Sequence, residues 1–333
     1  RSLTEPGSLN QGPAMGEDGA VPTFGLQLAT FGFRVPDDQL FDQVAQRAVA
    51  AEESGFRSLW VTDHVVQLPA LGGADQPMLE AYTLLGALAA RTSTATVGAL
   101  VAAVTHRNPA LLAKMTTTLD IISRGRAVLG LGAAWHGAGH AAYGLEFPPV
   151  GERMDRLEEA LQVCRAMFDH DHVTFEGTHY RTDDARNRPR PLQPGGPRIL
   201  VGGGGERRTL RLVAQYADAC NLHGEPERIR RKIDVLHRHC EEVGRDPATI
   251  AVTRLATLVI TRSSQQTGEL QNYLARAGGA DALADSNIGQ PAEIVDQLHE
   301  LADAGVEEFI FAMPLADPDA TRAAGELFTS AFA

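Results

Sequence analysis

The feature that most constrains the fold is one unit repeated eight times: a short apolar run, then an amphipathic helical pattern. The apolar runs lie at 24–30, 57–62, 95–101, 126–131, 198–201, 218–222, 250–260 and 307–312. The helical patterns lie at 38–54, 79–91, 108–122, 151–169, 206–216, 226–243, 291–304 and 317–331. Eight strands that each lead into a helix predict a closed parallel barrel of the (β/α)8 TIM type with insertions. An open doubly wound sheet of two lobes is the alternative.

Local signals divide the chain further. Proline follows a turn residue at the expected start of four helices, where its missing N–H costs nothing; the pairs are Asn108-Pro109, Glu225-Pro226, Gln290-Pro291 and Asp317-Pro318. Residues 1–22 are rich in Gly and Pro and are expected to be a disordered tail, so that 23–333 form one barrel domain. Three segments interrupt the repeat: 133–150, 173–197 with a hairpin around Glu176-Gly177, and 263–289, expected as short helices or a mobile lid.

Composition excludes several classes of protein. There are 42 Asp+Glu against 30 Lys+Arg, a net charge of -12, which argues against binding to nucleic acid or to an anionic membrane. No apolar run approaches the roughly 18 residues of a membrane helix, and residues 1–22 lack the apolar core of a secretory signal. The three scattered cysteines, Cys164, Cys220 and Cys240, are typical of reduced thiols, so a cytoplasmic location is expected.

Lysine usage narrows the chemistry. Lys114 and Lys232 are the only lysines, and both fall inside helical patterns. A Schiff-base lysine at a strand end or a P-loop lysine therefore has no candidate, which excludes an aldolase-like barrel. Active sites of such barrels lie at the carboxyl ends of the strands, so the residues that follow each strand are the candidates for function.

Two strand ends carry the sharpest candidates. Asp63-His64 follow the second strand, and the position of His64 at a strand end favours a functional role, the alternative being a histidine satisfied by Asp63 or by the backbone. Gly202, Gly203, Gly204 and Gly205 follow the fifth strand and precede Arg207, Arg208 and Thr209. Glycines permit close backbone approach and a helix N-terminus favours anions, so this loop predicts a phosphate site; a flexible turn with solvated arginines is the alternative.

A string of motifs in this order resembles the bacterial luciferase-like family, in its coenzyme F420-dependent branch. The motifs are Thr62-Asp63-His64, Thr105-His106-Arg107-Asn108-Pro109, Gly130-Leu-Gly132-Ala-Ala-Trp135, Arg153-x-x-Arg156 and Gly202-Gly-Gly-Gly-Glu-Arg-Arg-Thr-Leu210. The resemblance covers roughly residues 24–330. It implies a barrel that binds a flavin or a 5-deazaflavin in a cleft at the carboxyl ends of the strands.

The resemblance also implies roles for individual residues. His64 would lie against the deazaflavin ring and the substrate, and Trp135 and His136 would lie over the ring or near the substrate. A bulge, often with a non-prolyl cis peptide, is expected near Ala99–Leu100. The expected cofactor contacts are Ala99 and Leu100, the glycine loop with the Arg207, Arg208 and Thr209 that follow it, and Asp63, Thr105, Gly132 and Ala133. Some relatives carry a Glu at the Trp135 position as a proton donor; its absence here counts against a sugar-phosphate dehydrogenase.

Further features of the sequence leave more than one interpretation open. Eight arginines surround the glycine loop and would suit the polyglutamate tail of F420, or else form ion pairs with neighbouring carboxylates; they are Arg181, Arg186, Arg188, Arg190, Arg198, Arg207, Arg208 and Arg211. His136-x3-His140 has metal-like spacing but no apparent third ligand, so no metal is predicted. Asn221, His223, Phe311 and Met313 are expected to help line the pocket, although core packing explains Phe311 equally well.

These observations predict an oxidoreductase that transfers a hydride between F420 and a small organic substrate. One alternative is an FMNH2-dependent monooxygenase of the same fold, which uses dioxygen and FMN reduced by a separate reductase. Another is a non-catalytic flavin-binding barrel. The expected partner is a small molecule, with no nucleic acid and no membrane; a homodimer is left open.

Overall fold

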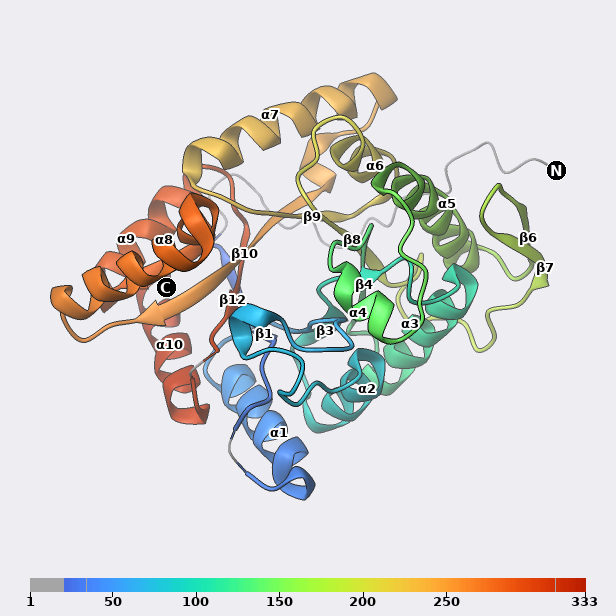
Figure 1. Cartoon of the computed structure of the whole chain (residues 1–333). Coiled ribbons are helices and arrows are strands. Elements are labelled where there is room, and N and C mark those ends of the chain that lie inside the picture. Colours follow the sequence, from blue (N-terminus) through green and yellow to red (C-terminus); the bar gives the residue numbers. More distant parts are fainter. Residues whose placement is uncertain (1–20, 34, 315) are drawn as a thin grey trace.

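The computed structural model describes residues 21–33, 35–314 and 316–333, so nearly all of the expected tail lies outside the described residues. Eight parallel strands close into a barrel (Figure 1). In order around the barrel they are β1 (Thr23–Leu28), β2 (Ser58–Val61), β3 (Thr96–Ala99), β5 (Ala127–Gly132), β8 (Arg198–Gly202), β9 (Ala219–Leu222), β10 (Ala251–Ile260) and β12 (Glu308–Ala312). β12 pairs with β1 from Thr23–Glu308 to Gln27–Ala312, which closes the ring. The predicted barrel is confirmed, and the open sheet is wrong.

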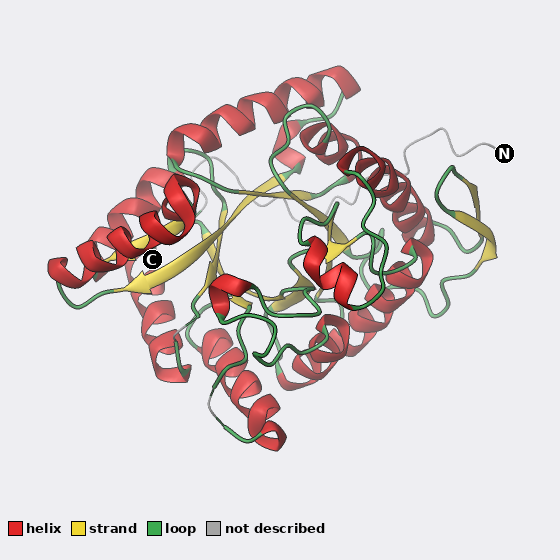
Figure 2. Ribbon diagram, viewed as in Figure 1, coloured by secondary structure: helices red, strands yellow, loops and turns green. Residues whose placement is uncertain are grey.

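Helices surround this ring of strands (Figure 2). Each barrel strand is followed by one of them: α1 (Asp37–Glu53), α2 (Ala81–Arg91), α3 (Pro109–Ser123), α5 (Val150–Asp169), α6 (Thr209–Tyr216), α7 (Pro226–Val243), α9 (Pro291–Ala302) and α10 (Pro318–Ala331). The four predicted proline starts are confirmed. At two of them the preceding side chain caps the helix: Asn108 accepts from the Ala110 N–H, and Asp317 accepts from the Ala320 N–H.

The three insertions add α4 (Gly137–Ala142), β6 (Val173–Glu176), β7 (Arg181–Ala185), α8 (Ser264–Ala284) and β11 (Ser286–Gly289), and other loops add η1 (Pro69–Leu71), β4 (Ala102–Ala103) and η2 (Pro247–Thr249). The predicted hairpin is the antiparallel pair β6–β7, which projects outside the ring of helices (Figure 2). Segment 263–289 forms α8, whose helix is interrupted at Gly279 (φ 72°), and then β11, an unexpected strand beside β10. α6 begins at Thr209 rather than at 206 because residues 206–208 form a turn.

Side chains fill the amino-terminal half of the barrel. Trp60, Leu200 and Ile310 belong to a buried cluster inside the ring. Below them the Trp60 indole N–H donates to the Ser58 hydroxyl oxygen at 2.7 Å, and Ser58 in turn donates to Glu308. Burial raises the pKa of Glu308. This end of the barrel is therefore packed, and open volume is left to the carboxyl end. Among the described residues, no helix combines the length and the apolar character needed to cross a membrane.

Candidate active site

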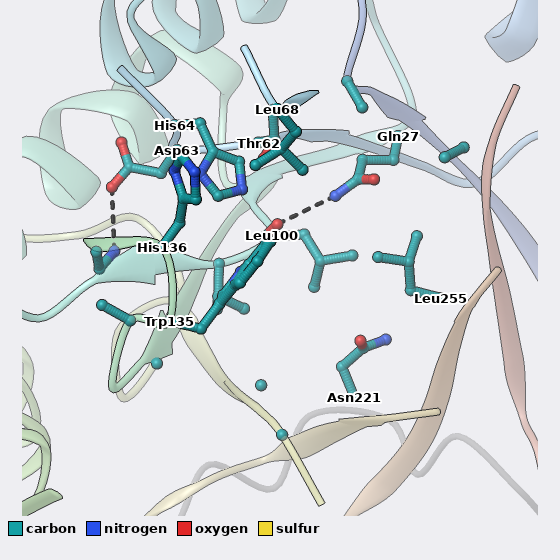
Figure 3. Close-up of a pocket in the computed structure, with 18 of the residues that line it drawn as sticks. Gln27, Thr62, Asp63, His64, Leu68, Leu100, Trp135, His136, Asn221 and Leu255 are labelled. Atoms are coloured by element: carbon teal, nitrogen blue, oxygen red, sulfur yellow. Dashed lines mark hydrogen bonds between the residues drawn. The ribbon is translucent and has the colours of Figure 1, made fainter. Parts of the chain in front are cut away.

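A cavity of about 790 Å³ lies at the carboxyl ends of the strands. Its lining comes from strands all around the ring and from the loops that follow them, as Figure 3 shows for Gln27, His64, Leu100, Asn221 and Leu255. This is the size range of small-molecule and cofactor sites. The cavity therefore lies where the barrel fold places its chemistry.

Asp63 organises one wall of the cavity from behind. Its carboxylate is buried and accepts hydrogen bonds from the Ala103 N–H (3.1 Å), from His106 Nδ1 (3.2 Å) and from Arg107 (2.7 Å). Burial alone would raise the pKa of Asp63, but the hydrogen bonds from His106 and Arg107 hold it below its usual range. The charge is therefore satisfied by protein groups. The histidine that is hydrogen-bonded to Asp63 is His106 and not His64. The His64 imidazole is therefore not engaged by the Asp63 carboxylate.

A ledge formed by Leu100 and Val101 enters the cavity between β3 and β4. The Leu100–Val101 peptide is cis, one bond later than the predicted Ala99–Leu100 bulge. The Gln27 side-chain amide donates to the Leu100 carbonyl oxygen at 3.1 Å (Figure 3). A Cβ atom at Gly132 or at Gly202 would lie 2.7 or 2.9 Å from the Val101 side chain, so only glycine fits beside this ledge.

His64, Trp135 and His136 gather at the mouth of the cavity (Figure 3). The His64 ring meets Trp135 edge-to-face at 5.5 Å and meets His136 at 5.6 Å between ring centroids. His64 is half-buried, whereas Trp135 is 67 % exposed. Burial, reinforced by the neighbouring His136, lowers the pKa of His64 to about 4. The imidazole is therefore neutral near pH 7 and can accept a proton.

The loop that carries Trp135 and His136 is tied down from two sides. The Arg153 Nε donates to the Ala133 carbonyl oxygen at 2.9 Å, and the guanidinium stacks on Phe147 at 4.0 Å. Buried His140 spans 3.0 Å from its Nδ1 to the His136 carbonyl oxygen and 2.6 Å from its Nε2 to the Thr105 hydroxyl. Both nitrogens of His140 are thus engaged. Within the described ranges, no group of three His, Cys, Asp or Glu side chains is placed to hold a metal ion.

The glycine loop divides into a part at the cavity and a part outside it. Gly202, Gly203 (φ 112°) and Thr209 line the cavity. Gly205 and Arg207 are exposed, and Arg208 pairs with Asp155 at 2.5 Å. Asp63, Leu100, Gly132 and Ala133 also line the cavity, whereas Ala99, Thr105 and Gly204 do not. The predicted cofactor contacts thus share one end of the barrel, but only part of them face the open volume.

Seven of the eight arginines around the glycine loop are engaged with the protein itself, and the eighth, Arg207, is exposed. Five further members pair with carboxylates besides Arg208: Arg181 with Glu176, Arg186 with Asp184, Arg188 and Arg190 with Asp171, and Arg211 with Glu158. Arg198 donates to the Asp218 carbonyl oxygen. These side chains are not part of the cavity lining. The geometry therefore favours the ion-pair interpretation over a groove for an anionic tail.

The opposite wall contains residues that the sequence pattern only partly indicated. Asn221, His223 and Met313 line the cavity, as expected, whereas Phe311 is fully buried in the core. The Asn221 amide donates to the Thr253 hydroxyl oxygen at 2.9 Å, which orients it on β9. Lining residues that were not predicted include Gln27, Leu68, Leu71, Leu255, Arg228, Asp281 and Asp285. Gln27 had one usable signal, because it is a polar residue near the end of an apolar strand.

Comparisons with known proteins agree with this architecture. The chain is 28 % identical over 324 residues to an F420-dependent glucose-6-phosphate dehydrogenase of Kineococcus radiotolerans, a match that covers 88 % of this chain and 94 % of that protein. A coenzyme F420-dependent tetrahydromethanopterin reductase from Methanopyrus kandleri superposes with a TM-score of 0.76 at 21 % identity, covering 94 % of this chain and all of that one.

An F420-dependent secondary alcohol dehydrogenase, solved with an F420-acetone adduct, superposes with a TM-score of 0.78 at 19 % identity, covering 93 % of this chain and 98 % of that one. At these identities the two structures support the fold alone. The sequence profile of one family, described as luciferase-like monooxygenase, matches residues 23–285. That match takes in more than half of the chain, including the barrel strands β1 to β10 and the residues at their carboxyl ends, and the chain therefore belongs to the luciferase-like monooxygenase family.

Proposed function

We propose that this protein is an F420-dependent oxidoreductase that exchanges a hydride with a small organic substrate in the cavity at the carboxyl end of the barrel. The observation that carries the proposal is the cavity that His64, the Leu100–Val101 ledge and the first glycines of the glycine loop line together. The similarity to F420-dependent glucose-6-phosphate dehydrogenases over most of the chain supports the choice of cofactor.

The lining fits a flat ring with a phosphate-bearing chain. The Leu100–Val101 ledge offers an apolar surface for the ring, and the glycines at 132 and 202 leave the room that the Val101 side chain occupies. Gly202, Gly203 and Thr209 lie near the start of α6, where backbone N–H groups and a hydroxyl suit a phosphate. When bound, the deazaflavin would supply the hydride chemistry.

His64 would manage the proton that accompanies the hydride. In the oxidative direction the substrate C–H bond breaks with its electron pair leaving as hydride, and the hydroxyl proton passes to the neutral imidazole of His64. In the reductive direction the same imidazole, protonated, would return the proton to the carbonyl oxygen. Trp135 and His136 would close the mouth and orient the substrate, since both rings meet His64 directly.

Titrating the protein with F420 and with FMN in parallel tests the choice of cofactor. The chain has two tryptophans, and Trp60 is buried inside the barrel whereas Trp135 is exposed at the cavity mouth. Binding of F420 should therefore quench mainly the Trp135 emission. The variant Trp135→Phe should lose that signal while still binding F420 by calorimetry. Tighter binding of FMN than of F420 would contradict the proposal and favour the monooxygenase.

The depressed pKa of His64 also predicts a pH dependence of stability. The unfolded histidine titrates at 6.5 and the folded one at about 4, so between these values the unfolded chain holds more protons. The free energy of unfolding should therefore fall as the pH drops from 6.5 toward 4, by at most on the order of 3 kcal/mol from this group. Thermal unfolding should show that His64→Gln loses less Tm over this window than the parent chain. Parallel Tm curves for the two proteins would rule out the shift.

A further inference from the structure

We propose, on the basis of the function above, that the substrate is an uncharged alcohol or its carbonyl counterpart rather than a phosphate ester. The cavity wall formed by His223, Arg228, Asp281 and Asp285, here called the acidic wall, sets this specificity. Asp285 is assigned as the acceptor for a substrate hydroxyl group. This assignment differs from the substrate in the names of the glucose-6-phosphate dehydrogenase relatives, because glucose 6-phosphate carries a dianionic phosphate group.

The charges on the acidic wall do not suit a phosphate. Within the residues that the structure describes, Arg228 is the one arginine in the cavity lining, and no lysine is present there. Arg228 is already paired with Asp281, at 3.0 Å from guanidinium to carboxylate. Asp285 adds a further negative charge. A phosphate monoester in this position would meet two carboxylates and one engaged cation, whereas phosphate sites offer free cations and converging N–H groups.

The histidines of the cavity do not supply the missing positive charge. Burial is the main cause of a lowered pKa at His64, His140 and His223, so these imidazoles are neutral at physiological pH. His106 faces Asp63, whose charge Arg107 already balances. His136, the fifth histidine of the lining, packs against His64 and Trp135 and is not part of the acidic wall. The acidic wall is therefore neutral to negative.

The start of α7 beside the acidic wall is also unsuited to an anion. The helix begins with Pro226, which has no N–H to donate, and Glu227 stands in its first turn. The carboxylate of Glu227 provides the negative charge that a helix N-terminus favours. An anionic ligand would have to compete with it.

Buried Arg254 fixes the acidic wall in place. Its guanidinium is 2 % exposed and donates to the Gly224 carbonyl oxygen, to Asn287 Oδ1 and to the Ala284 carbonyl oxygen, at 2.8 to 2.9 Å. Gly224 is adjacent to His223, and Ala284 is adjacent to Asp285. One side chain thus holds both loop ends and positions the histidine and the carboxylate together.

The Asp285 carboxylate retains hydrogen-bonding capacity. His223 Nδ1 lies 3.7 Å from Asp285 Oδ2, which is beyond hydrogen-bond distance. The other oxygen, Oδ1, is buried and has no hydrogen-bond partner among the described residues, so Oδ2 is the oxygen of this partly exposed side chain that a ligand in the cavity can reach. A carboxylate at a cavity wall with so few donors is stabilised by a ligand O–H group. Leu68, Leu71, Leu255 and Met313 line other parts of the cavity and suit an apolar substrate body.

Two measurements test the proposal, and the first does not need the cofactor. Calorimetric titration should show that the protein without F420 binds glucose 6-phosphate no more tightly than inorganic phosphate, which can occupy the glycine loop, and that the F420-loaded protein binds neither saturably. Tighter binding of glucose 6-phosphate than of inorganic phosphate, or saturable binding of it to the loaded protein, would overturn the proposal. If F420 itself fails to bind in the Trp135 titration, the proposed function fails, yet this phosphate measurement still decides whether the wall accepts an anion.

The second measurement follows reduction of bound F420 by a series of uncharged secondary alcohols and by glucose 6-phosphate. The alcohols should reduce the cofactor and the phosphate ester should not. Asp285→Ala should raise KM for the alcohols roughly tenfold with little change in kcat, because a hydrogen bond to a charged group is lost. Asp303→Ala is the matched control, since Asp303 ends α9 as Asp285 ends α8 but is exposed. The assignment would be refuted if glucose 6-phosphate reduced F420 or if none of the alcohols did. An unchanged KM for the alcohols in Asp285→Ala would refute it as well.

Discussion

His64→Ala should lower turnover with F420 by about 10²- to 10⁴-fold, the usual contribution of a positioned acid or base. The affinity for F420 should change little, because the expected ring support comes from the Leu100–Val101 ledge and the phosphate contacts from the glycine loop. Steady-state kinetics of the loaded enzyme give the first quantity, and Trp135 quenching gives the second. Reduced turnover with unchanged F420 affinity would indicate a proton-transfer role for His64, whereas a loss of both would indicate a packing role.

Two variants make this result specific. His172→Ala is the control, since His172 is an exposed histidine that pairs with Asp184 on the β6–β7 hairpin. It should retain full activity. His64→Gln keeps a polar side chain of similar size but cannot carry a proton at physiological pH, so it should be nearly as inactive as the alanine variant. Normal turnover in His64→Gln would remove His64 from the proton transfer.

The repeat of strand and helix was readable from the sequence because each unit has its own local pattern and punctuation. The proline starts at Pro109 and Pro226 are local events, and they appear where the residues indicate. β11 was missed because Ser286-Asn-Ile-Gly289 has neither the length nor the apolar content of a typical strand. Its pairing partner, β10, lies about 30 residues earlier, so the strand depends on tertiary contact.

The residues of the candidate site were predictable where their position at the end of a strand is enough to place them at the cavity. His64, Gly202 and Asn221 follow or end strands, and the barrel places all of them at one cavity. The direction of a side chain in a turn was not predictable. Arg208 belongs to the glycine loop in sequence, yet its guanidinium binds Asp155, 53 residues away on α5. Asp285 had no local signal, because it stands between a helix and a strand that only the fold brings to the cavity.

Asp63→Asn replaces one carboxylate oxygen by an amino group, and we expect it to lower the free energy of unfolding strongly for so small a change. Ala103, His106 and Arg107 all bind the same carboxylate oxygen, Oδ2, so the amide oxygen can take its place, but the charge that balances Arg107 is lost. Breaking a buried ion pair costs about 3–5 kcal/mol. The lower end is expected here because Arg107 retains a second carboxylate partner, Glu80. Urea unfolding should show a loss of about 3 kcal/mol.

Asp184→Asn provides the matched control for the same chemical change. Asp184 also binds a histidine and an arginine, His172 and Arg186, but its side chain is half exposed to solvent. Exposed pairs contribute at most about 1 kcal/mol, so this variant should unfold almost like the parent chain. Equal losses in the two variants would show that burial of the Asp63 carboxylate has no special consequence.

The same variant decides how Asp63 serves the cofactor site. The three hydrogen bonds to its carboxylate come from protein groups, and they join the end of β2 to β4 and to the residues that precede α3. We therefore expect Asp63→Asn to weaken F420 binding through displacement of the adjoining ledge. The measurement is the F420 affinity at a temperature where the variant remains folded. Because the ledge would be displaced in the folded state too, the affinity should fall even there. An unchanged affinity would mean that Asp63 stabilises the barrel without shaping the site.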